Sequence, residues 1–151
     1  LEMLASQGSA NCGEMNPEAH DSAAHRPSLD LWIAEAKKDK HAAQCGMYLF
    51  HEGVVRETAR SKVRFNNMNA EKVSGMLFSY DKVKLDEAIS NTLLMKGIYY
   101  VRAWLNEGRL NIGDDIMLVL VGGDIRPNVI DALQSLVSEI KNFCVHETEL
   151  Y

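Results

Sequence analysis

We predict an α+β domain from the order of the helix and strand patterns in the sequence. The length of 151 residues is that of one ordinary domain. The patterns follow the order α-β-loop-β-α-β-β-α-β, in which strand pairs flank two helices and no βαβα alternation is sustained. The pattern alone favours a ferredoxin-like sheet of the split βαβ type.

The composition is that of a soluble globular protein with an acidic balance. The chain has 46% hydrophobic and 25% charged residues, and 16 Lys+Arg against 21 Asp+Glu give a net charge of −5. This balance argues against nucleic acid or an anionic membrane as a partner. No apolar run approaches the roughly 20 residues of a membrane-spanning helix. Any anion site must therefore be a local basic cluster on an acidic protein.

Residues 1–28 are expected to be a disordered tail, in part left over from cloning, ahead of one domain over residues 29–151. The tail is rich in Ala, Ser, Gly, Asn and Glu, and it carries one basic residue, Arg26. It has neither the basic start nor the apolar core of a signal peptide, so we expect a cytoplasmic location.

The cysteine and histidine spacings predict neither a disulfide framework nor a metal site. Three cysteines are an odd number without CxxC spacing, and Cys45 and Cys144 are expected to be buried apolar residues. Cys144 and His146 stand two apart on a predicted strand, which gives no general-base geometry by itself. The five histidines do not cluster, so no metal and no cofactor are expected.

The first half of the domain is predicted to hold two helices and two strands. The first helix begins after Ser28, a good N-cap, and a strand over residues 46–55 follows. Gly53 within this strand indicates a bulge or a close backbone approach. Residues 56–69 lose periodicity, and a second strand is expected over residues 72–80. Asp81 then caps a helix that runs to about Lys96.

The second half is predicted to hold three strands and the last helix. Strands are expected over residues 98–105, 116–121 and 145–150, and Gly122–Gly123 is expected to end the middle one. The last helix is predicted from about Pro127 to Asn142. Its predicted apolar face has helical spacing and consists of Ile130, Leu133, Val137 and Ile140.

The most unusual local composition lies just after the first predicted strand. Arg56, Arg60, Lys62 and Arg64 fall within nine residues. Guanidinium groups bind phosphate and carboxylate oxygens bidentately, so this loop is a candidate anion site. The other interpretation is a solvated, mobile loop.

Two further cations are candidates at the ends of the last predicted helix. Arg126 stands just before this helix, where free backbone N–H groups favour an anion; otherwise it is a solvent-facing residue. Lys141 lies at the border of the apolar face near the helix end. A half-buried lysine there has a lowered pKa and can act as nucleophile or proton carrier. The alternative is a lysine that favours the helix dipole and reaches water.

Two motifs resemble the large, catalytic subunit of molybdopterin synthase, the MoaE family. The segment Gly46-Met-Tyr-Leu-Phe-His-Glu-Gly-Val-Val-Arg56 is similar to its first core strand, whose Gly-x-Val-Arg ending opens a mobile basic loop. Leu110-Asn-Ile-Gly-Asp-Asp-Ile116 resembles the family motif Leu-x-x-Gly-Asp-x-Ile. The stretch from Val119 through Arg126 to Lys141 follows with the family's ungapped spacing. The resemblance covers about residues 29–149.

The resemblance implies a fold that differs from the ferredoxin-like sheet favoured by the pattern. It also implies a specific activity. The fold would be of the α/β-hammerhead type with an additional antiparallel sheet. The large subunit would form a homodimer within a heterotetramer. Each copy would receive the Gly-Gly tail of a small ubiquitin-like subunit that carries a C-terminal thiocarboxylate. Sulfur would pass to cyclic pyranopterin monophosphate, forming the dithiolene of molybdopterin in molybdenum cofactor biosynthesis.

The resemblance also implies roles for the basic residues. Arg56 and Arg126 would bind the anions, and Lys141 would meet the thiocarboxylate and assist sulfur transfer. With Arg60, Lys62 and Arg64 they would form one small anion pocket. Both the tail and the substrate phosphate are anions, which fits a basic pocket.

The chain departs from the family at four positions. Ile125 stands where the family has a histidine before the arginine, and His51 replaces an aromatic residue. Glu147 lies nearest the place of a second active-site lysine, beside His146. A Glu in place of a cation weakens anion binding by about 1–3 kcal/mol in a partly buried site. The alternatives are therefore a divergent sulfurtransferase, a non-catalytic paralogue that keeps the fold, dimer and partner binding, and an unrelated small-ligand-binding domain.

Overall fold

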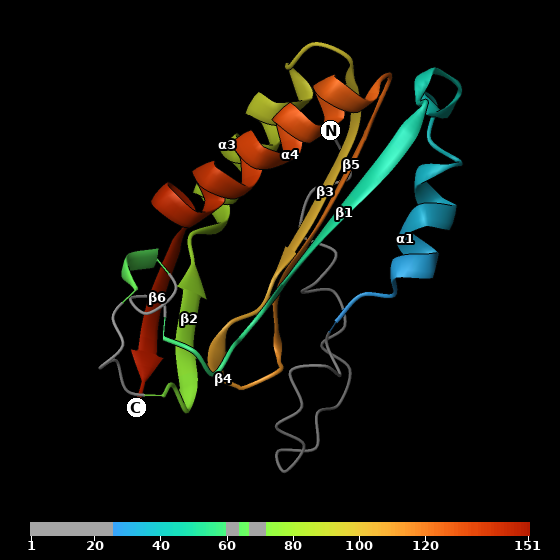
Figure 1. The fold of residues 1–151 in the computed structure, drawn as a ribbon. Coiled ribbons are helices and arrows are strands. Elements are labelled where there is room, and N and C mark those ends of the chain that lie inside the picture. Colours follow the sequence, from blue (N-terminus) through green and yellow to red (C-terminus); the bar gives the residue numbers. More distant parts are fainter. Residues whose placement is uncertain (1–25, 60–63, 67–71) are drawn as a thin grey trace.

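Two three-stranded antiparallel sheets form the framework of the protein (Figure 1). The computed structural model describes residues 26–59, 64–66 and 72–151. Sheet A has the order β1 (Met47–Val54), β5 (Asp115–Gly123), β3 (Ile98–Leu105). Sheet B has the order β4 (Gly108–Asn111), β2 (Gly75–Tyr80), β6 (Val145–Leu150). Neighbouring strands are antiparallel in both sheets.

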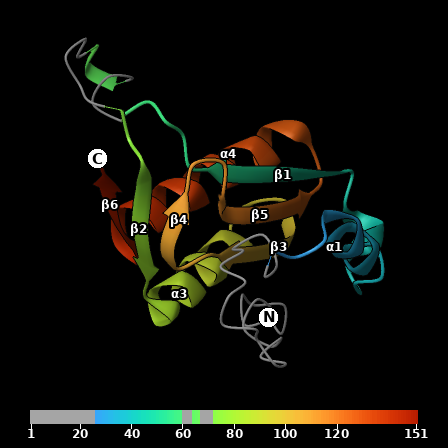
Figure 2. The same cartoon turned by 90° about the horizontal axis from the view of Figure 1, so that it is seen from below.

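Helices cover both faces of sheet A. Helices α3 (Lys82–Leu93) and α4 (Arg126–Glu139) lie side by side on one face, and α1 (Leu29–Ala36) lies on the other (Figures 1 and 2). A 3-10 turn, η3 (Ala42–Gln44), precedes β1, and a π-helical turn, η4 (Ile140–Cys144), joins α4 to β6. This architecture confirms the α+β class. The ferredoxin-like alternative is wrong, because the strands divide between two sheets.

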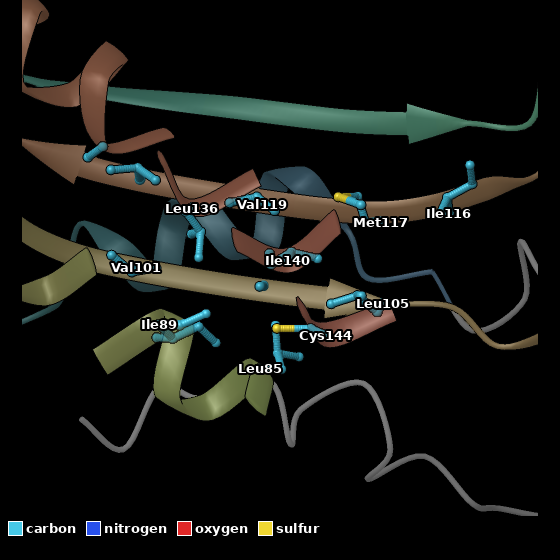
Figure 3. Close-up of a cluster of buried hydrophobic side chains, with 14 of the residues drawn as sticks. Leu85, Ile89, Val101, Leu105, Ile116, Met117, Val119, Leu136, Ile140 and Cys144 are labelled. Atoms are coloured by element: carbon cyan, nitrogen blue, oxygen red, sulfur yellow. The ribbon is translucent and has the colours of Figure 1, made fainter. Parts of the chain in front are cut away.

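Strand β5 is buried along its length because it supplies side chains to both faces of sheet A. Successive side chains point to opposite faces of a strand. Met117 and Val119 therefore join the core under α3 and α4 (Figure 3), whereas Leu118 and Leu120 join the core under α1. The sequence of a strand that is covered on both faces is a continuous apolar run, as in residues 116–121.

Both helix N-caps predicted from the sequence are confirmed. The Ser28 hydroxyl accepts a hydrogen bond from the Leu31 backbone N–H at 3.2 Å. The Asp81 carboxylate accepts from the backbone N–H groups of Val83 and Lys84 at 3.0 and 3.2 Å. These bonds satisfy donors that have no partner within the first helical turn.

An arginine holds α1 on sheet A, and the sequence patterns did not single it out. Arg102 on β3 is 6% exposed, and its guanidinium lies 4.6 Å from the centre of the Trp32 ring. It also forms an ion pair with Glu35 of the same helix. A buried arginine is tolerated when it is paired and stacked, so Arg102 fixes α1 by charge and by packing.

The predicted apolar face of the last helix is confirmed for Leu133, Val137 and Ile140, which pack in or against the core, and is wrong for Ile130. Ile130 is 38% exposed, and the fully buried residues of α4 are Val129, Ala132 and Leu136. Ile140 is buried as predicted. The centre of the buried face lies one residue to the side of the predicted stripe, because Val129 packs against Gly123 and the small Ala132 lies against the core.

Glycines in sheet A occur where the strand register shifts and where a neighbouring side chain packs closely on the backbone. The register of β1 against β5 shifts between Gly53 and Val54, which confirms the bulge expected at Gly53. Gly122 and Gly123 are the last two residues of β5, so the strand ends two residues later than predicted. A Cβ at Gly122 would lie 2.6 Å from the Tyr48 ring, so glycine is needed there for the ring to pack on the strand.

Candidate functional site

Lys141 lies in the π-helical turn η4, directly after α4. Ile140 and Cys144 at the ends of this turn are buried, and the three residues between them are exposed. Of the two alternatives for Lys141, the half-buried lysine is wrong, and the lysine that reaches water is the one observed. Cys144 closes the turn, with its thiol 3.8 Å from the Glu139 carbonyl oxygen, and does not lie on β6. π turns occur often at functional sites because the extra residue redirects side chains.

Residues around Lys141 locate it above the far end of β1. Ile140 packs on the face of sheet A that carries Met117 (Figure 3), and Met117 is paired with Gly53 of β1. The His51 imidazole lies near enough for the Lys141 charge to act on it. Burial, and to a smaller extent Lys141, lower the pKa of His51.

Arg56 leaves the same end of sheet A, two residues beyond β1. Its guanidinium is exposed, and Nε donates to the Thr58 carbonyl oxygen at 3.1 Å. The preceding residue, Val55, is buried and exchanges two backbone hydrogen bonds with the Gly113–Asp114 turn, at 2.8 and 3.0 Å. The Gly-Asp motif therefore anchors the start of the basic loop.

The rest of the basic loop is described in part. Arg64 is exposed to solvent. Arg60 and Lys62 lie outside the described residues, so their expected role in anion binding stays a prediction.

Arg126 lies at the opposite end of the sheet. It is the exposed first residue of α4 and follows the end of β5, where Gly123 pairs with Met47 at the start of β1. Fifteen residues separate it from Lys141, which corresponds to about 20 Å along the helix at 1.5 Å per residue. A single protomer does not bring Arg126 and Lys141 into one pocket, so the expectation of one anion pocket is wrong for the isolated chain.

The N-terminus of α4 already has an anion from its own chain. Ile125, 56% exposed, occupies the N-cap position without a side-chain hydrogen bond. The Asp124 carboxylate accepts from the Ile125 backbone N–H at 2.6 Å and from Asn128 Nδ2 at 2.9 Å. These hydrogen bonds lower the pKa of Asp124.

The two divergent residues on β6 point to opposite faces of sheet B. His146 is exposed and pairs with Ser79, whereas Glu147 is half-buried and pairs with the buried Phe78. Successive residues of a strand alternate between its faces, so His146 and Glu147 cannot serve one site together.

A second ionic cluster lies on the α1 side of sheet A. Arg26 forms ion pairs with Glu52 of β1 at 3.0 Å and with Asp115 of β5 at 2.8 Å. Burial and a hydrogen bond that the protonated Asp115 carboxyl donates to the Glu52 carboxylate raise the pKa of Asp115 to about 6, and the same bond lowers the pKa of Glu52. The acids stand 63 residues apart in the sequence, so no local pattern pairs them.

The described part of the chain holds neither a metal-binding cluster nor a membrane-spanning helix. Within residues 26–59, 64–66 and 72–151, no three His, Cys, Asp or Glu side chains are placed to hold a metal ion. Among the same residues, no helix has the length and apolar character needed to cross a membrane.

Comparison with known proteins identifies the family. The family model described as MoaE protein matches residues 25–143, which include Arg56, Arg126 and Lys141. The chain belongs to the MoaE family. Membership assigns it to molybdopterin biosynthesis and rules out an unrelated ligand-binding domain. A search of curated protein sequences found no match.

Solved structures show that the chain has the MoaE fold. Molybdopterin synthase from Staphylococcus aureus is 17% identical with a TM-score of 0.63, over 83% of this chain and 87% of that one. The MoaE protein from Burkholderia ambifaria is 15% identical with a TM-score of 0.61, over 82% of both chains. A complex of subunits 1 and 2 of molybdopterin-converting factor from Helicobacter pylori matches at 14% identity and a TM-score of 0.55, over 82% of this chain and 84% of that one.

Proposed function

We propose that this MoaE-family chain is a sulfurtransferase of the molybdopterin synthase type. Sulfur passes from the C-terminal thiocarboxylate of a small ubiquitin-like subunit to cyclic pyranopterin monophosphate. The observation that carries the proposal is the exposed Lys141 in the π turn, above the strand from which Arg56 and its basic loop depart. A lysine and an arginine suit two anionic reactants, the tail and the phosphate.

The two-subunit complex from Helicobacter pylori supports the proposal that this chain binds a small subunit. The tail of a small subunit ends in a thiocarboxylate, which Lys141 can meet without displacing core residues because its side chain is exposed. Arg56 binds an anion on the same side of the sheet.

Arg126 contributes to the site of a second protomer in this proposal. About 20 Å along α4 separates it from Lys141 in its own chain. A homodimer with twofold symmetry brings the beginning of one α4 toward the end of another, and each of its two sites then takes residues from both chains.

Reconstitution tests the activity directly. The wild-type chain, mixed with a thiocarboxylated small subunit and the pterin precursor, should yield the dithiolene product. Lys141→Ala should lower the rate at least 100-fold, because the group that meets the thiocarboxylate is lost. Lys37→Ala, an exposed lysine after α1 on the other face, is the matched control and should keep the wild-type rate. Binding of the small subunit without turnover by the wild type would indicate the non-catalytic paralogue.

Mixing inactive chains tests the shared site. When Arg126→Ala and Lys141→Ala chains exchange freely, half of the dimers contain one of each, and each such dimer has one intact site. About a quarter of the wild-type activity should return in a closed twofold dimer. No recovery, although the chains exchange, would place both residues in one protomer's site.

A further inference from the structure

Strands β1 and β5 lose their regular pairing just before Arg56 leaves the sheet. The register shifts between Gly53 and Val54, and one residue of β5 is left over there in a β-bulge. A bulge interrupts the ladder of backbone hydrogen bonds and bends the strand that carries it. The direction in which Arg56 leaves the sheet therefore depends on what holds the two strands together beyond the bulge.

Arg26 spans this bulge with its side chain. Its Nη2 donates a hydrogen bond to Glu52 Oε1 of β1 at 3.0 Å, on the near side of the bulge. Its Nε is buried and lies 2.8 Å from Asp115 Oδ2 of β5, which pairs with Val54 on the far side. One guanidinium thus binds a carboxylate on either side of the irregularity, and its planar fork fixes the distance between the two.

The charges at this place require a cation between the strands. In the described part of the chain, Arg26 is the cation that pairs with Glu52 and Asp115, and a further acid, Asp114, stands next to them. The side chain of Asp115 is 13% exposed and that of Arg26 is 29% exposed, so solvent screens their charges only in part. Without Arg26, the ionised Glu52 and Asp115 would repel each other across the bulge and favour separation of the two strand ends.

Asp115 connects these ion pairs to the start of the basic loop. The carbonyl oxygen of the residue before it, Asp114, accepts a hydrogen bond from the Val55 backbone N–H at 3.0 Å. The Gly113 N–H donates to the Val55 carbonyl oxygen at 2.8 Å. Val55 is buried and immediately precedes Arg56, so the position of the turn on β5 sets the position of Arg56.

We propose that Arg26 is a positioning residue for Arg56, because it clamps β1 to β5 across the bulge and so fixes the strand end from which Arg56 leaves. The clamp acts through Glu52 and Asp115, and Arg26 itself touches no reactant. This inference rests on the proposed function for its effect on sulfur transfer, whereas the effect of Arg26 on the strand ends does not.

Amide hydrogen exchange followed by NMR at pH 7.5 tests the clamp without any turnover. Arg26→Met should speed exchange at the Val55 and Gly113 amides by about tenfold or more, because their hydrogen bonds lie beyond the bulge. The Val119 amide, in the middle of β5, should keep its wild-type rate, and Arg26→Lys should recover part of the protection. Lys37→Met removes an exposed cation after α1 and is the matched control. Equal exchange at Val55 and Gly113 in wild type and Arg26→Met would overturn the proposal.

A double-mutant cycle tests the consequence for sulfur transfer, with KM measured for the small subunit and for the pterin precursor. Arg56→Ala should raise KM for the reactant that Arg56 binds. Arg26→Met should raise the same KM about fivefold and leave kcat unchanged, because binding alone is weakened. In the Arg56→Ala chain, Arg26→Met should have no further effect on KM, since it acts through Arg56. Additive effects of the two substitutions would refute the positioning role.

The two arms separate the two proposals. An inactive wild-type chain in which Arg26→Met still speeds exchange at Val55 would refute the proposed function and leave the clamp intact. Glu52→Leu removes only the β1 side of the clamp and should speed exchange at the same amides to a smaller extent, which tests the clamp even if Arg26→Met does not fold. An unchanged exchange rate in Glu52→Leu would contradict the clamp. The midpoints of urea unfolding of all variants verify that each chain is folded.

Discussion

Asp115→Asn is expected to remove a pH dependence of stability that comes from the Arg26 cluster. The pKa of Asp115 is raised from 3.8 to about 6 in the folded chain. A carboxyl with a raised pKa holds its proton more tightly when the chain is folded. Its contribution to the free energy of unfolding is complete below about pH 4 and is lost as the pH rises through 6.

The magnitude follows from the size of the shift and from the partner carboxyl. A shift of about two units corresponds to about 3 kcal/mol at 1.36 kcal/mol per unit. The Asp115 side chain is 13% exposed, so solvent screens this effect weakly. The pKa of Glu52 shifts downward, and that contribution has the opposite sign. We therefore expect a net change of about 1–2 kcal/mol.

Urea unfolding at several pH values between 4.5 and 7.5 measures this effect. The stability of the wild type relative to Asp115→Asn should improve by about 1–2 kcal/mol from pH 7.5 to 4.5. Asp131→Asn, which alters an exposed carboxyl on α4, is the matched control. A difference between wild type and Asp115→Asn that is the same at both pH values would refute the reasoning.

Two further predictions concern packing, and thermal or urea unfolding measures both. Gly123→Ala should cost at least about 2 kcal/mol, because its Cβ would lie 2.5 Å from the Gly97 carbonyl oxygen. Gly108→Ala, with open space but a φ of 93°, should cost about 1 kcal/mol; equal costs would contradict the packing argument. Leu136→Ala should cost about 2–5 kcal/mol and Ile130→Ala less than about 1 kcal/mol. The reverse order would restore the helical face predicted from sequence.

Elements with local signals could be predicted from the sequence. The bounds of β3 and β6 agree with prediction because both strands are bordered by clear helix ends or turn residues. The Ser28 and Asp81 caps were predictable because a cap acts within three residues of its own position. The composition and spacing marked Arg56, Arg126 and Lys141 only as candidate anion-binding residues. The family motifs then implied a role for each of them.

Features that depend on distant contacts could not be predicted from the sequence. The exposure of Lys141 follows from the π turn, which the burial of both Ile140 and Cys144 imposes. The separation of Arg126 from Lys141 requires the observed helix length and orientation. The burial of the His51 ring atom Nε2 is a property of the packed sheet that no spacing in the sequence carries.

The strand order of sheet A bears on how the chain folds during synthesis. Met47 at the start of β1 pairs with Gly123 at the end of β5, 76 residues later. Pairings so distant in sequence slow folding, because a long loop must close before any contact forms. Strand β1 therefore leaves the ribosome well before its partner and waits with both edges unpaired. Helix α3 and strand β3, which are adjacent in sequence and in contact, can assemble first, and β5 then joins them and receives β1 last.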